Sequence, residues 1–194
     1  IDAAARFGDG LPANVVPLLL NEVTQVGLET IAASVAYGFR AVRLLTRARP
    51  RHDIAGLRAT VETATRILSG LGYGTDAVGI IETDDPDALG ESLRMPRPPV
   101  APLARATFLP LGAKRDLMKL GLRELHRMAP APQARIELAK GAAFGGLAID
   151  TAKCTLCLAC VSACPVSALG DAADQPLLSF DESLCVQCGL CVAT

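Results

Sequence analysis

The residues of this chain that could do chemistry are its seven cysteines, which all lie between Cys154 and Cys191. Residues 1–153 contain none. Disulfide frameworks are typical of small secreted chains, with an even number of cysteines spread through the sequence. An odd, clustered set in a chain that is 51% hydrophobic indicates instead thiolate ligands for metal in a reducing compartment, and we expect a cytoplasmic protein.

The cysteines form two copies of one spacing pattern, Cys-x-x-Cys-x-x-Cys. The six that follow it are Cys154, Cys157 and Cys160 in the first copy, and Cys185, Cys188 and Cys191 in the second. Each cysteine of the second copy lies 31 positions after its counterpart, and Asp150 and Asp181 keep the same offset. A repeat at a fixed offset predicts two copies of one local structure.

The first copy continues further than the second. It runs on to Cys164 and Pro165, so the offset predicts a cysteine at position 195 and a proline at 196. The sequence stops at Thr194 and opens at Ile1 rather than at methionine. We therefore expect a piece of a longer protein, cut one residue before an eighth cysteine.

This spacing suits a cubane iron–sulfur cluster. A cubane has four iron corners that each take one thiolate, and a tight Cys-x-x-Cys-x-x-Cys loop reaches three of them. Small residues such as Ala159 and Gly189 allow backbone amides to approach the cluster sulfurs. The fourth thiolate must come from elsewhere. Cys160 and Cys164, four residues apart, could lie on one short helical turn and point in different directions.

Two other uses of the cysteines remain open at this point. A zinc ribbon needs only two Cys-x-x-Cys pairs, but it leaves Cys154, Cys164 and Cys191 unexplained and gives no reason for a Cys-Pro pair. A thioredoxin-like redox pair requires a neighbouring βαβ pattern, which this part of the sequence lacks.

The run from Cys154 to Pro165, with its partial copy from Cys185 to Cys191, resembles the bacterial-type two-[4Fe–4S] ferredoxin domain over residues 146–194. This resemblance implies a small α+β fold of two short hairpins and two short helices, in which Ile149 and Phe180 lie on equivalent strands and pack over the clusters. It implies two [4Fe–4S] clusters. Their ligands would be Cys154, Cys157, Cys160 and residue 195 for the first, and Cys164, Cys185, Cys188 and Cys191 for the second.

Upstream, residues 1–94 alternate strand-like and helix-like patterns. Apolar runs predict strands over 15–20, 41–45 and 77–82, each followed by a helical pattern, and residues 1–8 read as the end of a further helix. This order predicts an α/β domain with a parallel sheet in βαβαβα order. Asn21, Glu22 and Gln25 follow the first strand, where open α/β sheets bind ligands, unless they only cap a turn.

Residues 95–135 separate this domain from the ferredoxin-type domain, which we place at 136–194. Four prolines within 95–102 predict a stiff connector. A basic amphipathic helix is expected over 113–128. Its cations are Arg115, Lys119, Arg123 and Arg127, which are either solvated or available to an acidic redox partner.

Residues 1–94 also resemble, more distantly, the delta-type iron–sulfur subunit of methyl-viologen-reducing hydrogenase, which works beside heterodisulfide reductase. The matching segments are 15–37, 38–42 and 68–74. That subunit carries cysteines for its own cluster, whereas the corresponding loop here, 20–25, has none. If the fold is shared, this domain docks or supports partners rather than passing electrons.

Several function classes find no support in the sequence. The net charge of −1 gives no electrostatic case for nucleic acid, and the most apolar stretch, 31–45, is too short and too charged for membrane insertion. We expect an electron-transfer component rather than a catalyst, relaying single electrons to or from an oxidoreductase. The resemblances suggest hydrogenase, heterodisulfide-reductase-type or formate-dehydrogenase-type partners. The alternatives are a redox-sensing or assembly protein with structural clusters, or part of a larger oxidoreductase.

Overall fold

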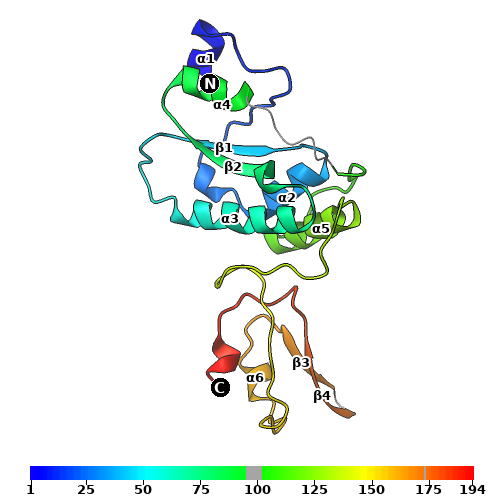
Figure 1. Ribbon diagram of the computed structural model, residues 1–194. Coiled ribbons are helices and arrows are strands. Elements are labelled where there is room, and N and C mark those ends of the chain that lie inside the picture. The colour runs from blue at the N-terminus through cyan, green and yellow to red at the C-terminus, as the bar shows by residue number, and fades with distance from the viewer. Residues whose placement is uncertain (95–101, 173) are drawn as a thin grey trace. The chain divides into compact units, whose positions relative to one another are not determined.

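A computed structural model describes residues 1–94, 102–172 and 174–194 of the chain (Figure 1). Its contacts divide into two compact units, Ile1–Ile136 and Glu137–Thr194, called unit 1 and unit 2 below. The proline-rich connector expected over 95–102 lies outside the described residues except for Pro102.

Unit 1 is built on two parallel strands, β1 (Val42–Thr46) and β2 (Val78–Glu82). They pair in register, with Val42 opposite Val78 and Thr46 opposite Glu82. Helix α3 (Ala55–Gly70) connects them, as a parallel pair requires. The structure therefore confirms a mixed α/β fold with a small parallel sheet.

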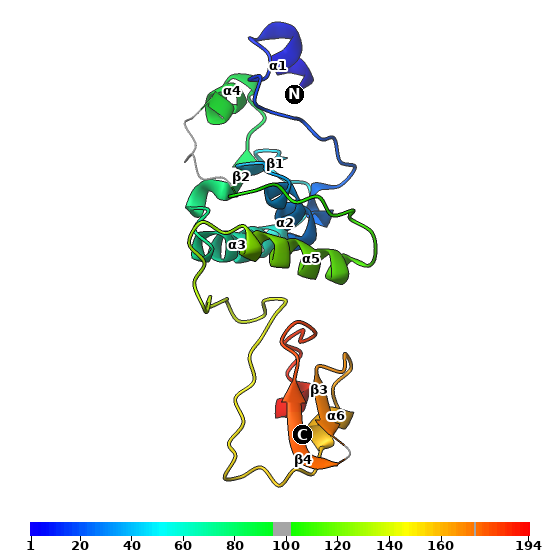
Figure 2. The same cartoon turned by 90° about the vertical axis from the view of Figure 1, so that its right-hand side faces the viewer.

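Helices α2 (Leu28–Ala36) and α3 lie on one side of this sheet, and α5 (Lys114–Arg127) packs on α2 (Figures 1 and 2). Close packing of α5 on α2 depends on Gly121, because a Cβ there would lie 3.2 Å from the Cβ of Ala32. The largest fully buried side chains of this layered core are Ile31, Val35, Leu57, Leu68, Leu125 and Met128.

The segment that carries the basic helix belongs to unit 1. The Tyr73 hydroxyl donates a hydrogen bond of 2.8 Å to the carbonyl of Leu125, and the Tyr37 hydroxyl donates one of 2.6 Å to that of Phe108. The rings of Tyr37 and Phe108 also stack, with centroids 5.1 Å apart. Two buried or half-buried tyrosines thus anchor this segment to the α/β core.

The prediction of a first strand over 15–20 is wrong. These residues adopt no regular secondary structure, and the Leu19 side chain is 97% exposed. An apolar run becomes a strand only where a neighbouring strand accepts its hydrogen bonds, and Pro17 removes one of the donors. The βαβαβα order therefore does not form within the described residues.

Helices flank the sheet region at two further places. Helix α1 (Asp2–Phe7) contacts α4 (Pro86–Arg94), which begins at a proline, a residue favoured at the first helical position. The Asp85 carboxylate accepts a 2.9 Å hydrogen bond from the Asp87 backbone N–H and so acts as the N-cap of α4. None of the described helices has both the length and the apolar character needed to cross a bilayer.

Unit 2 contains one antiparallel hairpin among its described residues, β3 (Leu169–Ala172) with β4 (Gln175–Phe180). Its helical parts are α6 (Ala159–Ser162) and the 3-10 helix η3 (Leu190–Val192). The second hairpin implied by the ferredoxin resemblance does not form among these residues.

Ile149 accordingly lies outside any strand and is 41% exposed, whereas Phe180 ends β4. A strand around Ile149 requires a backbone partner, and no described residue of unit 2 pairs with it.

Candidate metal centre

The two cysteine loops share one unusual backbone geometry. In the first loop, Cys157 lies between Leu156 (φ 54°) and Leu158 (φ 61°). In the second, Cys188 lies between Gln187 (φ 52°) and Gly189 (φ 77°). A left-handed residue other than glycine costs about 1–2 kcal/mol. Such residues persist where the surrounding structure requires them, and they gather at binding sites.

Aspartates build the turns that lead into both loops. The Asp150 carboxylate accepts a hydrogen bond of 3.1 Å from the Ala152 N–H, and the Asp181 carboxylate accepts one of 2.8 Å from the Ser183 N–H. These side-chain bonds close the local turn that an aspartate favours. The sequence repeat singles out both aspartates, but their role as turn-forming residues emerges from the structure.

The loops also end alike. The N–H of Val161 donates to the carbonyl of Leu158 at 3.0 Å, and the N–H of Val192 donates to that of Gly189 at 3.0 Å. Each loop therefore passes directly from a left-handed residue into a short helical turn, α6 or η3. Successive left- and right-handed residues turn their N–H groups toward one concavity, an arrangement that occurs at anion and iron–sulfur sites.

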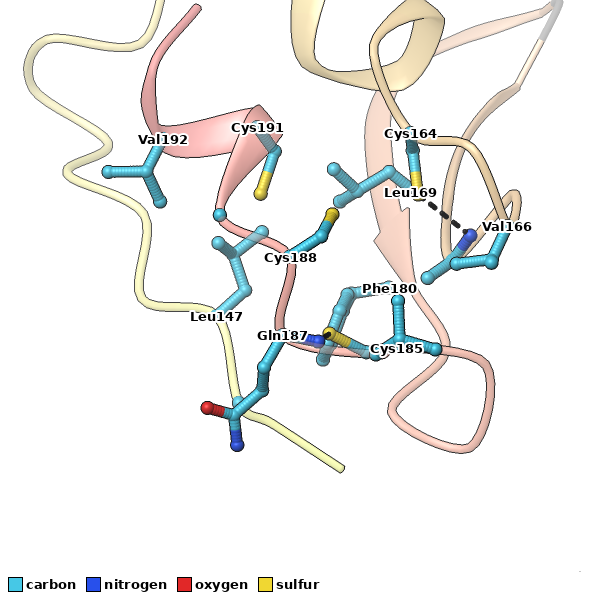
Figure 3. Close-up of a pocket in the computed structure, with 14 residues that line it drawn as sticks. Leu147, Cys164, Val166, Leu169, Phe180, Cys185, Gln187, Cys188, Cys191 and Val192 are labelled. Carbon is cyan, nitrogen blue, oxygen red and sulfur yellow. Dashed lines mark hydrogen bonds between the residues drawn. The ribbon is translucent and has the colours of Figure 1, made fainter. Parts of the chain in front are cut away.

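A cavity of about 240 Å³ lies within unit 2, beside the second loop (Figure 3). Four cysteines line it: Cys164, Cys185, Cys188 and Cys191. Its apolar lining residues include Leu147, Val166, Leu169, Phe180, Val186 and Val192. The structure thus brings Cys164, from the end of the first copy, to the same cavity as the whole second copy.

The other three cysteines do not line this cavity. Cys154 and Cys157 are exposed, and Cys160 is half-buried. Cys160 lies on α6, whereas Cys164 follows that helix and lies outside it, so α6 does not contain both cysteines. Cys164 lines the cavity and Cys160 does not.

Backbone N–H groups approach several of the sulfurs. The Ala168 N–H donates to Cys164 Sγ at 3.2 Å, and the Gln187 N–H donates to Cys185 Sγ at 3.5 Å (Figure 3). The Val166 N–H makes the largest contribution to lowering the pKa of the Cys164 thiol, and further backbone N–H groups assist. These donors favour the thiolate, which is the form that binds metal.

The first loop shows the same effect at Cys157. The pKa of this thiol is lowered chiefly by the backbone N–H of Ala159, and next by the side chain of Thr155. The approach of an amide to the sulfurs of a bound cluster, expected from the small residue at 159, stays a prediction.

The donor set fits an iron–sulfur cluster in its chemistry. No group of three or more His, Cys, Asp or Glu side chains within the described ranges converges closely enough to hold one metal ion. A single zinc ion needs its thiolates around one atom, whereas a cubane takes them at four separate corners. Four thiols around an apolar cavity, with N–H groups that donate to the sulfurs of Cys164 and Cys185, suit a cubane.

The comparison with protein families decides the class of this region. The family model described as a 4Fe-4S binding domain matches residues 147–170, which include the whole first cysteine copy and Cys164. The chain contains a 4Fe-4S binding domain. It is therefore an iron–sulfur protein with a ferredoxin-type domain for at least one [4Fe–4S] cluster. No curated protein and no solved structure matches the chain.

The resemblance of residues 1–94 to a hydrogenase subunit is not supported by these comparisons. The 4Fe-4S binding domain match lies entirely in unit 2. The first segment of that resemblance, 15–37, also lacks its expected strand at 15–20, although its helix is present as α2.

Two other candidate positions of unit 1, Glu22 and Arg127, make local hydrogen bonds or ion pairs. The Glu22 carboxylate accepts hydrogen bonds from the Thr24 N–H at 3.1 Å and the Thr24 hydroxyl at 2.8 Å, and the N–H bond makes the largest contribution to lowering the pKa of Glu22. This is the capped turn that was the alternative to a ligand site. On the basic helix, Arg127 pairs with Glu124 at 2.6 Å.

Proposed function

We propose that this chain is an electron-transfer protein or subunit that relays single electrons to or from a partner oxidoreductase through [4Fe–4S] clusters, one of which takes all four of its thiolates from these 194 residues. The observation that carries the proposal is the cavity of unit 2, because its four cysteines are those that the ferredoxin resemblance implies for one cluster. Two of them, Cys164 and Cys185, come from different copies of the repeat.

In this proposal the two copies exchange a ligand. Cys164 holds the second cluster together with the cysteines of the second loop, while Cys154, Cys157 and Cys160 hold the first cluster. The first cluster takes its fourth thiolate from position 195, where the repeat predicts it. Such an exchange keeps two clusters close together on one small framework, which favours rapid transfer between them.

The residues around the cavity would control the cluster in three ways. The thiolates hold it, the apolar side chains of Leu169 and Phe180 limit access of water, and the N–H groups of Ala168 and Gln187 donate to ligating sulfurs. When bound, a [4Fe–4S] cluster supplies one-electron chemistry, and its potential depends on such hydrogen bonds and on solvent exposure.

The proposed partner is a redox protein that exchanges single electrons with this domain. Hydrogenase-type and heterodisulfide-reductase-type partners were suggested by the resemblance of residues 1–94, which the comparisons do not support. The proposal therefore commits to a partner oxidoreductase without choosing its class.

Anaerobic reconstitution of the 194-residue chain with iron and sulfide tests the proposal. We expect a brown protein that contains acid-labile sulfide and shows the EPR signal of a reduced [4Fe–4S] cluster, and that undergoes repeated one-electron reduction and oxidation. A colourless protein under strict anaerobic handling, or one that holds zinc on these thiols, would contradict it.

The ligand assignment has its own test. Cys164→Ala should remove the second cluster's signal and leave the thiols of the first loop still able to bind iron. Val166→Ala is the matched control, because Val166 lines the same cavity without a thiol. If Cys164→Ala keeps the iron content and EPR spectrum of the unsubstituted chain, Cys164 is not a ligand.

A further inference from the structure

A segment preceding the first cysteine loop lies against the second one. This segment, residues 141–147, is called the strap here. Its Gly146 and Leu147 line the cysteine cavity together with Gln187 of the second loop (Figure 3). The strap and the second loop belong to the same compact unit.

The side chain of Gln187 ties the two segments together. Its amide oxygen accepts a hydrogen bond of 3.3 Å from the Gly141 N–H, and its amide nitrogen donates to the carbonyl of Phe144. The approach is close at Gly145, where a Cβ would lie 2.4 Å from the Gln187 Cγ. Only glycine fits at that point of the strap without a shift of its neighbours.

The same residue also contacts a proposed cluster ligand through its backbone. The Gln187 N–H donates to Cys185 Sγ, and this N–H is aimed by a left-handed backbone that is unfavourable for glutamine. Two side-chain hydrogen bonds to the strap can hold that conformation. One residue therefore links the strap, the loop conformation and a ligating sulfur.

The first loop has no side-chain amide at the position that corresponds to Gln187. The residue equivalent to Gln187 is Leu156, which has the same left-handed backbone but a side chain without any hydrogen-bonding group. The two copies are alike in their turns and differ at this position. The difference points to a property that only the second cluster site has.

We propose that Gln187 is a positioning residue for the second cluster site. Its amide fastens the strap over the cavity and holds its own backbone N–H on Cys185 Sγ. This inference rests on the proposed function, because it assumes a cluster held by Cys164 and the second loop. Its consequence is a second cluster that is lost more slowly, and is easier to reduce, than it would be without the amide.

The test uses the reconstituted 194-residue chain and the variant Gln187→Gly. Glycine tolerates the left-handed backbone, so this variant removes the side-chain bonds without adding strain. We expect cluster loss to an iron chelator to become roughly tenfold faster, as for other groups that orient metal ligands. We also expect a more negative reduction potential and faster hydrogen exchange at Gly141.

Two further variants test whether the effects of Gln187→Gly depend on its hydrogen bonds to the strap or reflect a general loosening of unit 2. Leu156→Gln, the reciprocal change in the first loop, should leave the chelator rate, the potential and the exchange of the strap unchanged. Gln187→Glu keeps an acceptor for the Gly141 N–H but places a carboxylate against the Phe144 carbonyl, so it should resemble Gln187→Gly rather than the unsubstituted chain. Exchange within α3 of unit 1 serves as an internal reference.

The outcomes distinguish this inference from the proposed function. If the unsubstituted chain holds a cubane, and Gln187→Gly matches it in chelator rate, potential and Gly141 exchange, the role of Gln187 is overturned while the electron-transfer proposal stands. If Leu156→Gln produces the same changes as Gln187→Gly, the effect is not specific to the strap and the inference also fails. A chain that assembles no cubane overturns both.

Discussion

The two units of this chain differ in what holds them together. Unit 1 has a core of large, fully buried aliphatic side chains, which include Ile31 on α2 and both Leu57 and Leu68 on α3. Among the described residues of unit 2, the buried apolar side chains are only Ala142, Ala168 and Leu169. A unit of this size without a substantial core usually depends on disulfides or metal. We therefore expect unit 1 to fold by burial of its core, and unit 2 to depend on metal binding.

The largest expected effect comes from removing the metal. If binding supplies the folding free energy of unit 2, a chelator under reducing conditions should unfold residues 137–194 and leave 1–136 intact. Hydrogen exchange with mass spectrometry should then show loss of protection in β3 and β4 but none in α3. Equal protection of β3 and β4 with and without iron would refute the dependence of unit 2 on metal.

A substitution in the core of unit 1 should lower the stability of that unit and leave unit 2 unchanged. Leu68 is fully buried on α3, and Leu68→Ala should lower the free energy of unfolding of unit 1 by about 2–5 kcal/mol. Urea unfolding followed by circular dichroism measures this change, and the iron content of reconstituted protein should not fall. A parallel loss of iron would mean that the two units do not fold independently.

Alkaline pH should weaken unit 1 through Tyr73. Burial raises the pKa of the Tyr73 hydroxyl to about 12 in the folded chain, from an ordinary value of 10.0. Because the folded state keeps the proton longer, this contribution to stability is complete below about pH 10 and is lost as the pH rises toward about 12. Urea unfolding at a series of pH values measures it.

The control for this effect is Tyr73→Phe. At neutral pH the substitution should cost about 1 kcal/mol, since the hydrogen bond to the Leu125 carbonyl is lost. Above about pH 10 the difference between the two proteins should shrink. A difference that stays constant up to about pH 12 would show that Tyr73 does not titrate in the way proposed.

The smallest effect tests the likeness of the two cysteine loops. Gly189 has a left-handed backbone, and no described atom beyond its chain neighbours lies within 4 Å of the position that a Cβ would take. Gly189→Ala should therefore cost at least about 1 kcal/mol, through strain in the left-handed backbone. The reciprocal change Leu158→Gly should not destabilise unit 2. The midpoint of thermal cluster loss measures both. A stabilising Gly189→Ala would show that the holoprotein loop leaves the left-handed region.

The local features of the chain could be predicted from the sequence. The offset of 31 residues predicts two like turns, and the structure has matching hydrogen bonds at Asp150 and Asp181. The N-cap at Asp85 and the start of α4 at Pro86 were also predictable. These features depend on residues only a few positions apart, so the types and spacing of those residues are sufficient to determine them.

Other features depend on neighbours that are distant in the sequence. Residues 15–20 have the composition of a buried strand, yet no described strand pairs with them, and the apolar side chains of Val16, Leu18 and Leu19 remain exposed. Whether an apolar run pairs is decided by what the rest of the chain places next to it. The sequence pattern contains no information on that neighbour.

The same distinction between local and distant contacts applies to the cluster site. The sequence by itself determined that thiolates recur at cubane spacing, because three ligands of one loop are separated by two residues each. The resemblance to two-cluster ferredoxins implied that Cys164 joins the second loop, and the tertiary structure places these cysteines around one cavity. Only the tertiary structure decided that Gln187, rather than Leu156, is bound by a strap. Those contacts join residues 21 or more positions apart, and folding rather than spacing brings them together.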